Sequence, residues 1–114
     1  MAVTTKRAEG GSFVQMTITA GETGQFLIPV SSGKNVKLGI NDGHGATYDV
    51  ITQLAPFAQR DQRDQAITAN TYTEVSAQTG SYNAKFALAM GQVGIDITAT
   101  PTSDLILEVS EGAN

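Results

Sequence analysis

The chain has 114 residues, of which 40 % are hydrophobic and 16 % charged, and it has a net charge of −4 and no cysteine. This length fits one domain, and the lack of cysteine excludes a disulfide framework and thiolate chemistry. No group of Lys and Arg is concentrated enough for a nucleic-acid footprint, and no apolar run is long enough to span a bilayer, so neither a nucleic-acid nor a membrane partner is expected.

The first eleven residues, MAVTTKRAEGG, are polar, contain glycine and show no periodicity. They predict a polar N-terminal arm over residues 1–11, which would lie along a partner if it is ordered. The residues after Lys6 and Arg7 do not form an apolar segment, so no secretory signal is expected.

From residue 12 onward, apolar and polar residues alternate with the period of two that half-buried strands show. In the first half of the chain this alternation predicts strands over residues 12–19, 25–30, 35–40 and 47–54, with turns at 20–24 and 31–34. Because Pro29 cannot donate a ladder hydrogen bond, strand 25–30 is predicted to lie at an edge or to end there. The inward-facing residues are predicted to be Val14, Met16, Ile18, Phe26, Ile28, Val30, Val36, Leu38, Ile40, Tyr48, Val50, Thr52 and Leu54.

The segment INDGHGATYD, residues 40–49, holds the chain's only histidine, His44. Its Asn-Asp-Gly and His-Gly sequences tolerate the positive φ angles that hairpin loops require. We therefore predict that it is the loop of a hairpin between strands 35–40 and 47–54.

A chemical role for His44 is the alternative, since Asp42 and Asp49 lie near it in sequence. A triad needs a nucleophile held by the histidine, and a zinc site needs three or four ligands, but the chain has one His and no Cys. A strand, not a helix, follows Gly43-His44-Gly45, which argues against a phosphate loop. We predict no catalytic, cofactor-binding or metal-binding residues and a protein that is not an enzyme, with a loop-bound calcium ion as an alternative.

The middle segment, residues 56–67, breaks the alternation and contains the tandem tripeptide QRDQRD at residues 59–64. Pro56 suits a first helical position, but apolar residues occur only at the two ends, so a helix would have no continuous buried stripe. The segment is predicted to be a short surface helix or a long polar loop.

Alternation returns in the last third of the chain. It predicts strands over residues 70–77, 81–90, 93–99 and 104–109, turns at 78–80, 91–92 and 101–103, and a C-terminal tail at 111–114. The inward faces are predicted to carry Tyr82, Ala84, Phe86, Leu88, Met90, Val93, Ile95, Ile97, Leu105, Leu107 and Val109.

About eight short strands at this spacing, without interleaved helices, predict an all-β domain over residues 12–110. The expected architecture is an antiparallel β-sandwich or a jelly-roll-like barrel, with a polar N-terminal arm and a central loop or short helix. The order of the strands cannot be predicted from the sequence.

An interface with another chain is predicted where Arg and amide side chains would project from the domain, because the planar guanidinium pairs with carboxylates and carbonyls. Simple solvent exposure, with local Arg–Asp pairs of little energetic weight, is the competing interpretation. The candidate interface residues are Lys6, Arg7, His44, Phe57, Gln59, Arg60, Gln62 and Arg63.

A resemblance to known proteins rests on the polar arm and three further stretches. These are GETG followed by FLIPV at residues 21–30, ANTYTEV at 69–75 and IDITATPTSDLILEV at 95–109. In this style it resembles small β-rich structural proteins of tailed-bacteriophage virions, of the capsid decoration or cement type. The resemblance rests on no single motif and assigns no individual residue a role. It implies a non-enzymatic virion subunit, assembled in the host cytoplasm, that forms a homo-oligomer, with a trimer favoured. Its partner would be the major capsid protein or another virion subunit.

Two alternatives remain. One is a phage tail or head-fibre component, and the other is a carbohydrate- or ligand-binding β-sandwich module with a tyrosine-lined groove. An enzyme that uses His44 is the least favoured interpretation, because the chain offers few partner residues for it.

Overall fold

The computed structural model describes residues 3–8, 12–54, 59–60, 63, 65–67 and 70–112. Within these residues the secondary structure consists of nine strands and no helix, which confirms the all-β prediction. The strands are β1 (Val3–Arg7), β2 (Phe13–Ile18), β3 (Gly24–Ile40), β4 (Thr47–Gln53), β5 (Gln59–Arg60), β6 (Ala66–Ile67), β7 (Thr71–Thr79), β8 (Tyr82–Ala99) and β9 (Leu105–Gly112).

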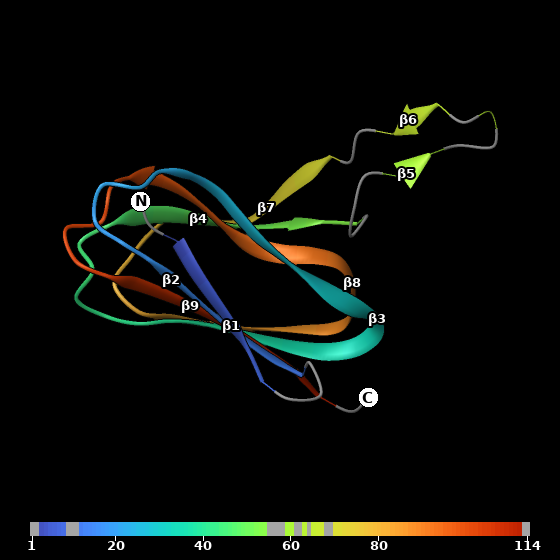
Figure 1. The fold of residues 1–114 in the computed structure, drawn as a ribbon, viewed down its shortest axis with the longest axis horizontal. Coiled ribbons are helices and arrows are strands. Elements are labelled where there is room, and N and C mark those ends of the chain that lie inside the picture. Colours follow the sequence, from blue (N-terminus) through green and yellow to red (C-terminus); the bar gives the residue numbers. More distant parts are fainter. Residues whose placement is uncertain are drawn as a thin grey trace.

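Seven of these strands form one antiparallel sheet in the order β1-β2-β9-β3-β8-β4-β7, and β5 and β6 pair separately with each other. In Figure 1 the β5–β6 hairpin extends beyond the ends of β4 and β7, away from the rest of the molecule. The two edge strands of the seven-stranded sheet are therefore β1 and β7.

Two long strands fold this sheet into a sandwich. The first part of β3 pairs with residues 91–97 of β8, and its last part pairs with residues 82–89 of the same strand, with register shifts between Val30 and Val36. Gly33 and Gly91 lie at this shift in register, where the strands bend, with φ angles of 78° and 87°. Residues that carry a Cβ rarely adopt such angles. Figure 1 shows β3 and β8 curving together there. Strands that bend in this way pass from one layer of a sandwich to the other.

The two layers follow from the pairing. One contains β1, β2, β9 and the halves of β3 and β8 nearest residues 40 and 82. The other contains the opposite halves of β3 and β8, followed by β4 and β7. Residues 24–30 of β3 pair only with β8, as expected for an edge segment that contains Pro29.

The core lies between the layers and is made by the inward faces that alternation predicted. Its buried members include Ile18, Leu38, Ile95 and Leu107, all fully buried. Leu54 is an exception, since it is 63 % exposed while Ile51 is buried. The β4–β7 register shifts at Val50 and Ile51, and a bulge of this kind changes which face later side chains occupy.

Four predicted strands proved to be two. Residues 25–30 and 35–40 both belong to β3, and residues 81–90 and 93–99 both belong to β8. The glycine-containing turns predicted at 31–34 and 91–92 were therefore wrong. Glycine at these places allows a bend within a continuous strand, and local sequence does not distinguish a bend from a reversal.

The hairpin predicted between residues 35–40 and 47–54 is also wrong, because β3 and β4 are not neighbours in the sheet. β3 ends in one layer and β4 begins in the other, so residues 41–46 connect the two layers. Alternation places the apolar face of each strand on the core, but it does not determine which layer the strand joins.

Two polar segments are more ordered than the sequence suggests. Residues Val3–Arg7, inside the predicted arm, form β1 and pair with β2. In the central segment, Gln59 pairs with Ile67 and Arg60 with Ala66, so the described residues there form a short hairpin instead of the predicted helix or loop. At the other end of the chain, Glu111 and Gly112 continue β9.

Candidate binding surface

His44 is fully buried, which corrects its placement among the candidate interface residues. The backbone N–H of Ala46 donates to Nδ1 of His44 at 2.9 Å, and Nε2 lies 3.0 Å from the carbonyl oxygen of Gly80. Since an N–H can only donate, Nδ1 accepts, and the proton lies on Nε2 and is donated to Gly80. The imidazole therefore acts as a structural link between two interlayer connections.

The same connection is bound to a third one. The carbonyl oxygen of His44 accepts hydrogen bonds from the backbone N–H groups of Thr102, at 2.7 Å, and Ser103, at 3.3 Å. The Tyr48 hydroxyl donates to the carbonyl of Gly80 at 2.8 Å, and its ring packs edge-on against His44, with centroids 5.6 Å apart. Burial, together with the nearby Tyr82, raises the pKa of Tyr48 to about 12.

These contacts leave His44 without a catalytic or metal-binding arrangement. Both ring nitrogens are used in hydrogen bonds to backbone groups. In the described part of the chain, no three His, Cys, Asp or Glu side chains come together as a metal site, and every buried side-chain polar atom has a hydrogen-bond partner. Nor do the described residues contain a helix long and apolar enough to cross a membrane.

The other candidate interface residues lie in two separate places. Lys6 and Arg7 are exposed on β1, an edge of the sheet. Gln59 and Arg60 form β5, and Arg63 is exposed in the turn between β5 and β6. Phe57 and Gln62 fall outside the described residues. The interface role of all these residues remains a prediction.

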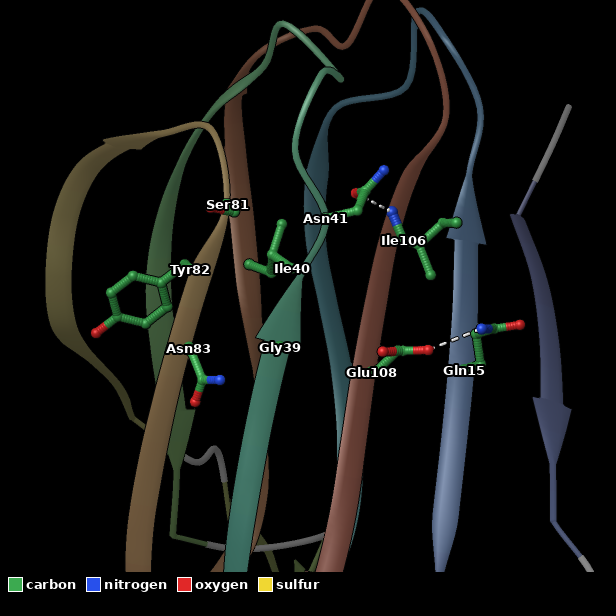
Figure 2. Close-up of a pocket in the computed structure, with 9 residues that line it drawn as sticks. All are labelled: Gln15, Gly39, Ile40, Asn41, Ser81, Tyr82, Asn83, Ile106 and Glu108. Atoms are coloured by element: carbon green, nitrogen blue, oxygen red, sulfur yellow. Dashed lines mark hydrogen bonds between the residues drawn. The ribbon is translucent and has the colours of Figure 1, made fainter.

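A third surface, which the sequence did not indicate, lies on the outer face of the layer that contains β2 and β9. One part of it is a depression of about 560 Å³. The register aligns Gln15, Glu108, Gly39 and Asn83 in one row across β2, β9, β3 and β8. Figure 2 shows Gly39 between Asn83 on one side and Glu108 and Gln15 on the other. We call this surface the outer groove.

The outer groove continues along the strands toward the bend in β3 and β8. A second depression, lined by Phe13, Lys37 and Ser110, shares Gly39, Asn83 and Glu108 with the first. A third shares Lys37 and Ser110 with the second and adds Lys85.

The groove is lined by both polar and apolar residues. Nε2 of Gln15 donates to the carboxylate of Glu108 at 2.8 Å, and Asn41 is held by Ile106 N–H at 2.8 Å and by the carbonyl of Asp104 at 3.1 Å. The ring of Tyr82 points away from the Gln15–Glu108 pair (Figure 2). The polar side chains of its first depression are mainly amides and one carboxylate, and Tyr82 is its one tyrosine among the described residues, whereas the carbohydrate-binding alternative predicts a groove lined by several tyrosines.

Sequence reasoning missed this surface for an identifiable reason. Its residues alternate with the core residues and appeared only as solvent-facing positions. The one local signal was Gly39, a glycine inside an otherwise regular strand, which often marks the close approach of a ligand or another backbone.

Comparison with known proteins gives only distant structural similarities. No protein-family model and no curated protein sequence matches the chain. Among solved structures, it is similar to a periplasmic inhibitor of g-type lysozyme, PliG from Aeromonas hydrophila, with 21 % identity and a TM-score of 0.48 over 94 % of this chain and 92 % of that one.

Two further structures have lower scores. The SPBc2 prophage-derived protein YomS has 10 % identity and a TM-score of 0.44, over 88 % of this chain and 95 % of that one. A Clostridium thermocellum xylanase fragment with CBM22-1 and GH10 modules has 14 % identity and a TM-score of 0.42, over 98 % of this chain and 24 % of that one. All three similarities are too weak to carry a function to this chain.

Proposed function

We propose that the chain is a non-enzymatic virion structural protein of the capsid decoration type, which binds the major capsid protein or another virion subunit. The observation that carries this proposal is the β5–β6 hairpin. Its strands pair only with each other, and it extends away from the sandwich (Figure 1).

A two-stranded hairpin with so few paired residues has little stability of its own. Contact with a partner would supply the stabilisation that the sandwich does not give it. Arg60 lies in β5 and Arg63 is exposed in the turn, and the guanidinium group is well suited to pairing with carboxylates and backbone carbonyls on another subunit.

The edge strand β1 supports the same proposal. All its residues after Val3 are exposed, and one side of its backbone faces no other strand of the sheet. Such an edge can add a strand from a neighbouring chain. Repetition of two modest contacts over a lattice produces firm attachment through multivalency, which is how a homo-oligomer, with a trimer favoured, would hold a capsid.

The experiment is co-sedimentation of the purified chain with empty capsids of the phage that encodes it. The double variant R60E/R63E is expected to weaken binding at least about tenfold, since each charge-assisted hydrogen bond is worth about one factor of ten. The matched control, K34E/K85E, makes the same change in net charge outside the hairpin and should bind like the wild type. Native mass spectrometry of the free chain measures the oligomer. A monomeric chain that does not bind capsids, or equal binding by the two double variants, would refute the proposal.

A further inference from the structure

The outer groove has a composition that neither the core nor the proposed capsid contacts explain. Its row of residues runs through Gln15, Glu108, Gly39 and Asn83, on four neighbouring strands. None of these residues belongs to β5, β6 or the β1 edge. The groove can therefore be considered as a separate binding site.

Gly39 is the first sign of a ligand. No atom lies within 4 Å of the position where a Cβ would stand, so close packing inside the protein does not require glycine there. Its φ angle is not in the positive range, so the backbone does not require it either. Glycine weakens a strand interior, and its benefit here is an open floor between Asn83 and Glu108 (Figure 2).

The hydrogen-bonding groups around this floor indicate the class of ligand. The amides of Gln15 and Asn83 can both donate and accept, whereas the carboxylate of Glu108 only accepts. Sugar hydroxyls can do both and match such a mixed set. Gln15 and Glu108 already pair with each other, but a fatty or aromatic ligand would cover the exposed amide of Asn83 and the unused oxygens of this pair without offering them hydrogen bonds. A peptide strand would be expected to add to a sheet edge, not to lie across a sheet face.

The other end of the groove adds a charge requirement. Lys37 on β3 and Lys85 on β8 are directly opposite each other in the register, and both are exposed. Like charges in this position, with Cβ atoms about 5 Å apart, destabilise a sheet. Among the described residues, neither lysine side chain has an ion pair or a hydrogen bond. A bound anionic group between them would remove this repulsion.

The distance between the two ends suits a chain of sugars better than a single sugar. Asn35 on β3 and Asn41, the residue after the end of β3, line opposite ends of the groove. They are six residues apart, or about 20 Å at the usual rise of a strand. From the groove, its open floor and its lysine pair, we propose that the outer groove binds an acidic oligosaccharide. The hydroxyls lie at the Gln15–Asn83 end, and a carboxylate or sulfate group lies between Lys37 and Lys85.

The test uses the full chain and four probes at low ionic strength. They are tetragalacturonate, a heparin tetrasaccharide, neutral cellotetraose and an acidic peptide of glutamates, each titrated by ¹H–¹⁵N NMR. Both acidic oligosaccharides are expected to bind, and cellotetraose is expected to bind at least about tenfold more weakly, the value of one charge-assisted contact. Amide shifts should fall on residues 35–41, 81–85 and 106–110.

Binding to only one of the acidic oligosaccharides would also support the proposal. Because heparin carries both sulfates and carboxylates, binding to heparin alone would indicate a requirement for sulfate, and binding to tetragalacturonate alone would indicate selection of a uronate chain without sulfates. Failure of both to bind at millimolar concentration would overturn it. Equal binding of cellotetraose would overturn the charge requirement, and equal or tighter binding of the glutamate peptide would show that the site recognises acidic protein segments instead.

Two variants separate the groove from the fold. G39Y fills the floor and should abolish the groove shifts while the melting temperature stays the same or rises, because a strand gains from an aromatic residue. K37E places opposite charges across the β3–β8 pair, which favours the fold, yet it should weaken acidic oligosaccharides about tenfold or more. The control R7E makes the same change in net charge on β1 and should bind normally. Binding that survives G39Y would overturn the proposal. The proposed capsid contacts use other residues. The outcome of the capsid-binding experiment therefore does not affect the outcome of this oligosaccharide-binding test.

Discussion

Replacement of His44 tests whether this buried ring holds the end of the sandwich together. In H44A, the N–H of Ala46, a residue only 1 % exposed, loses its acceptor. An unsatisfied buried N–H costs about 1–3 kcal/mol, and the loss of the edge-on contact with Tyr48 adds about 0.5–1.5 kcal/mol. The carbonyl of Gly80 keeps the Tyr48 hydroxyl as a donor, so the loss of its hydrogen bond from His44 costs less. We expect H44A to lower the free energy of unfolding by about 3 kcal/mol.

H44N is the matched control, because an asparagine side-chain oxygen can accept from the N–H two residues later. It should keep the bond to Ala46 and lose the hydrogen bond to Gly80 and the ring contact with Tyr48, at a cost of about 1–2 kcal/mol. H44F keeps an aromatic ring beside Tyr48 and loses both ring hydrogen bonds, so it should resemble H44A. If H44A and H44F are both more destabilised than H44N, most of the effect comes from the hydrogen bond that the Ala46 N–H donates.

The assay is urea unfolding followed by circular dichroism at neutral pH. If H44A costs less than about 1 kcal/mol, the ring is not a structural link. If H44N and H44A are equally destabilised, the local hydrogen bond to Ala46 is not the main contribution. Either result would refute the reasoning.

Three further predictions concern single positions. The pKa of Tyr48 is raised from 10.0 to about 12 in the folded chain. The free energy of unfolding should therefore be independent of this group below pH 10 and fall by about 2–3 kcal/mol between pH 10 and pH 12. In urea unfolding at several pH values the Y48F variant should lack this fall, and an identical fall in Y48F would contradict the assignment. Ala77 has a φ angle of 56°, so A77G should raise the free energy of unfolding by about 0.5–1 kcal/mol, whereas the neighbouring S76G should lower it; a loss in A77G would show that the angle carries no strain. A Cβ at Gly94 would overlap the carbonyl oxygen of Phe26, so G94A should lower the melting temperature by more than about 10 °C. The control G39A should leave the melting temperature unchanged or raise it, and equal effects of the two substitutions would refute the steric account.

The predictable part of the fold came from alternation. Period-two patterning placed nearly all the core side chains correctly, from Val14 to Val109, because a half-buried strand exposes every second residue whatever its neighbours are. Pro29 correctly indicated an edge, because its missing N–H is a property of the residue itself.

The candidate site was much less predictable. His44 was assigned to a hairpin loop, but it is buried where three interlayer connections meet. Its hydrogen-bond partners Gly80 and Thr102 lie 36 and 58 residues away. Nothing local to INDGHGATYD indicates that these partners are close.

The outer groove shows the same limit. Gln15, Gly39, Asn83 and Glu108 are scattered along the sequence and become one row only through strand register. Register depends on which strands pair, and pairing depends on the whole sheet.

The sequence by itself determined that the chain is all-β, which residues face the core and where the chain can bend. Only the tertiary structure decided that Gly33 and Gly91 bend two continuous strands instead of reversing the chain, and that β3 and β4 lie in different layers. The physical reason is that side-chain alternation and backbone angles are local properties. Strand order, the burial of His44 and the outer groove depend on contacts between distant segments, which form only when both layers close over one core.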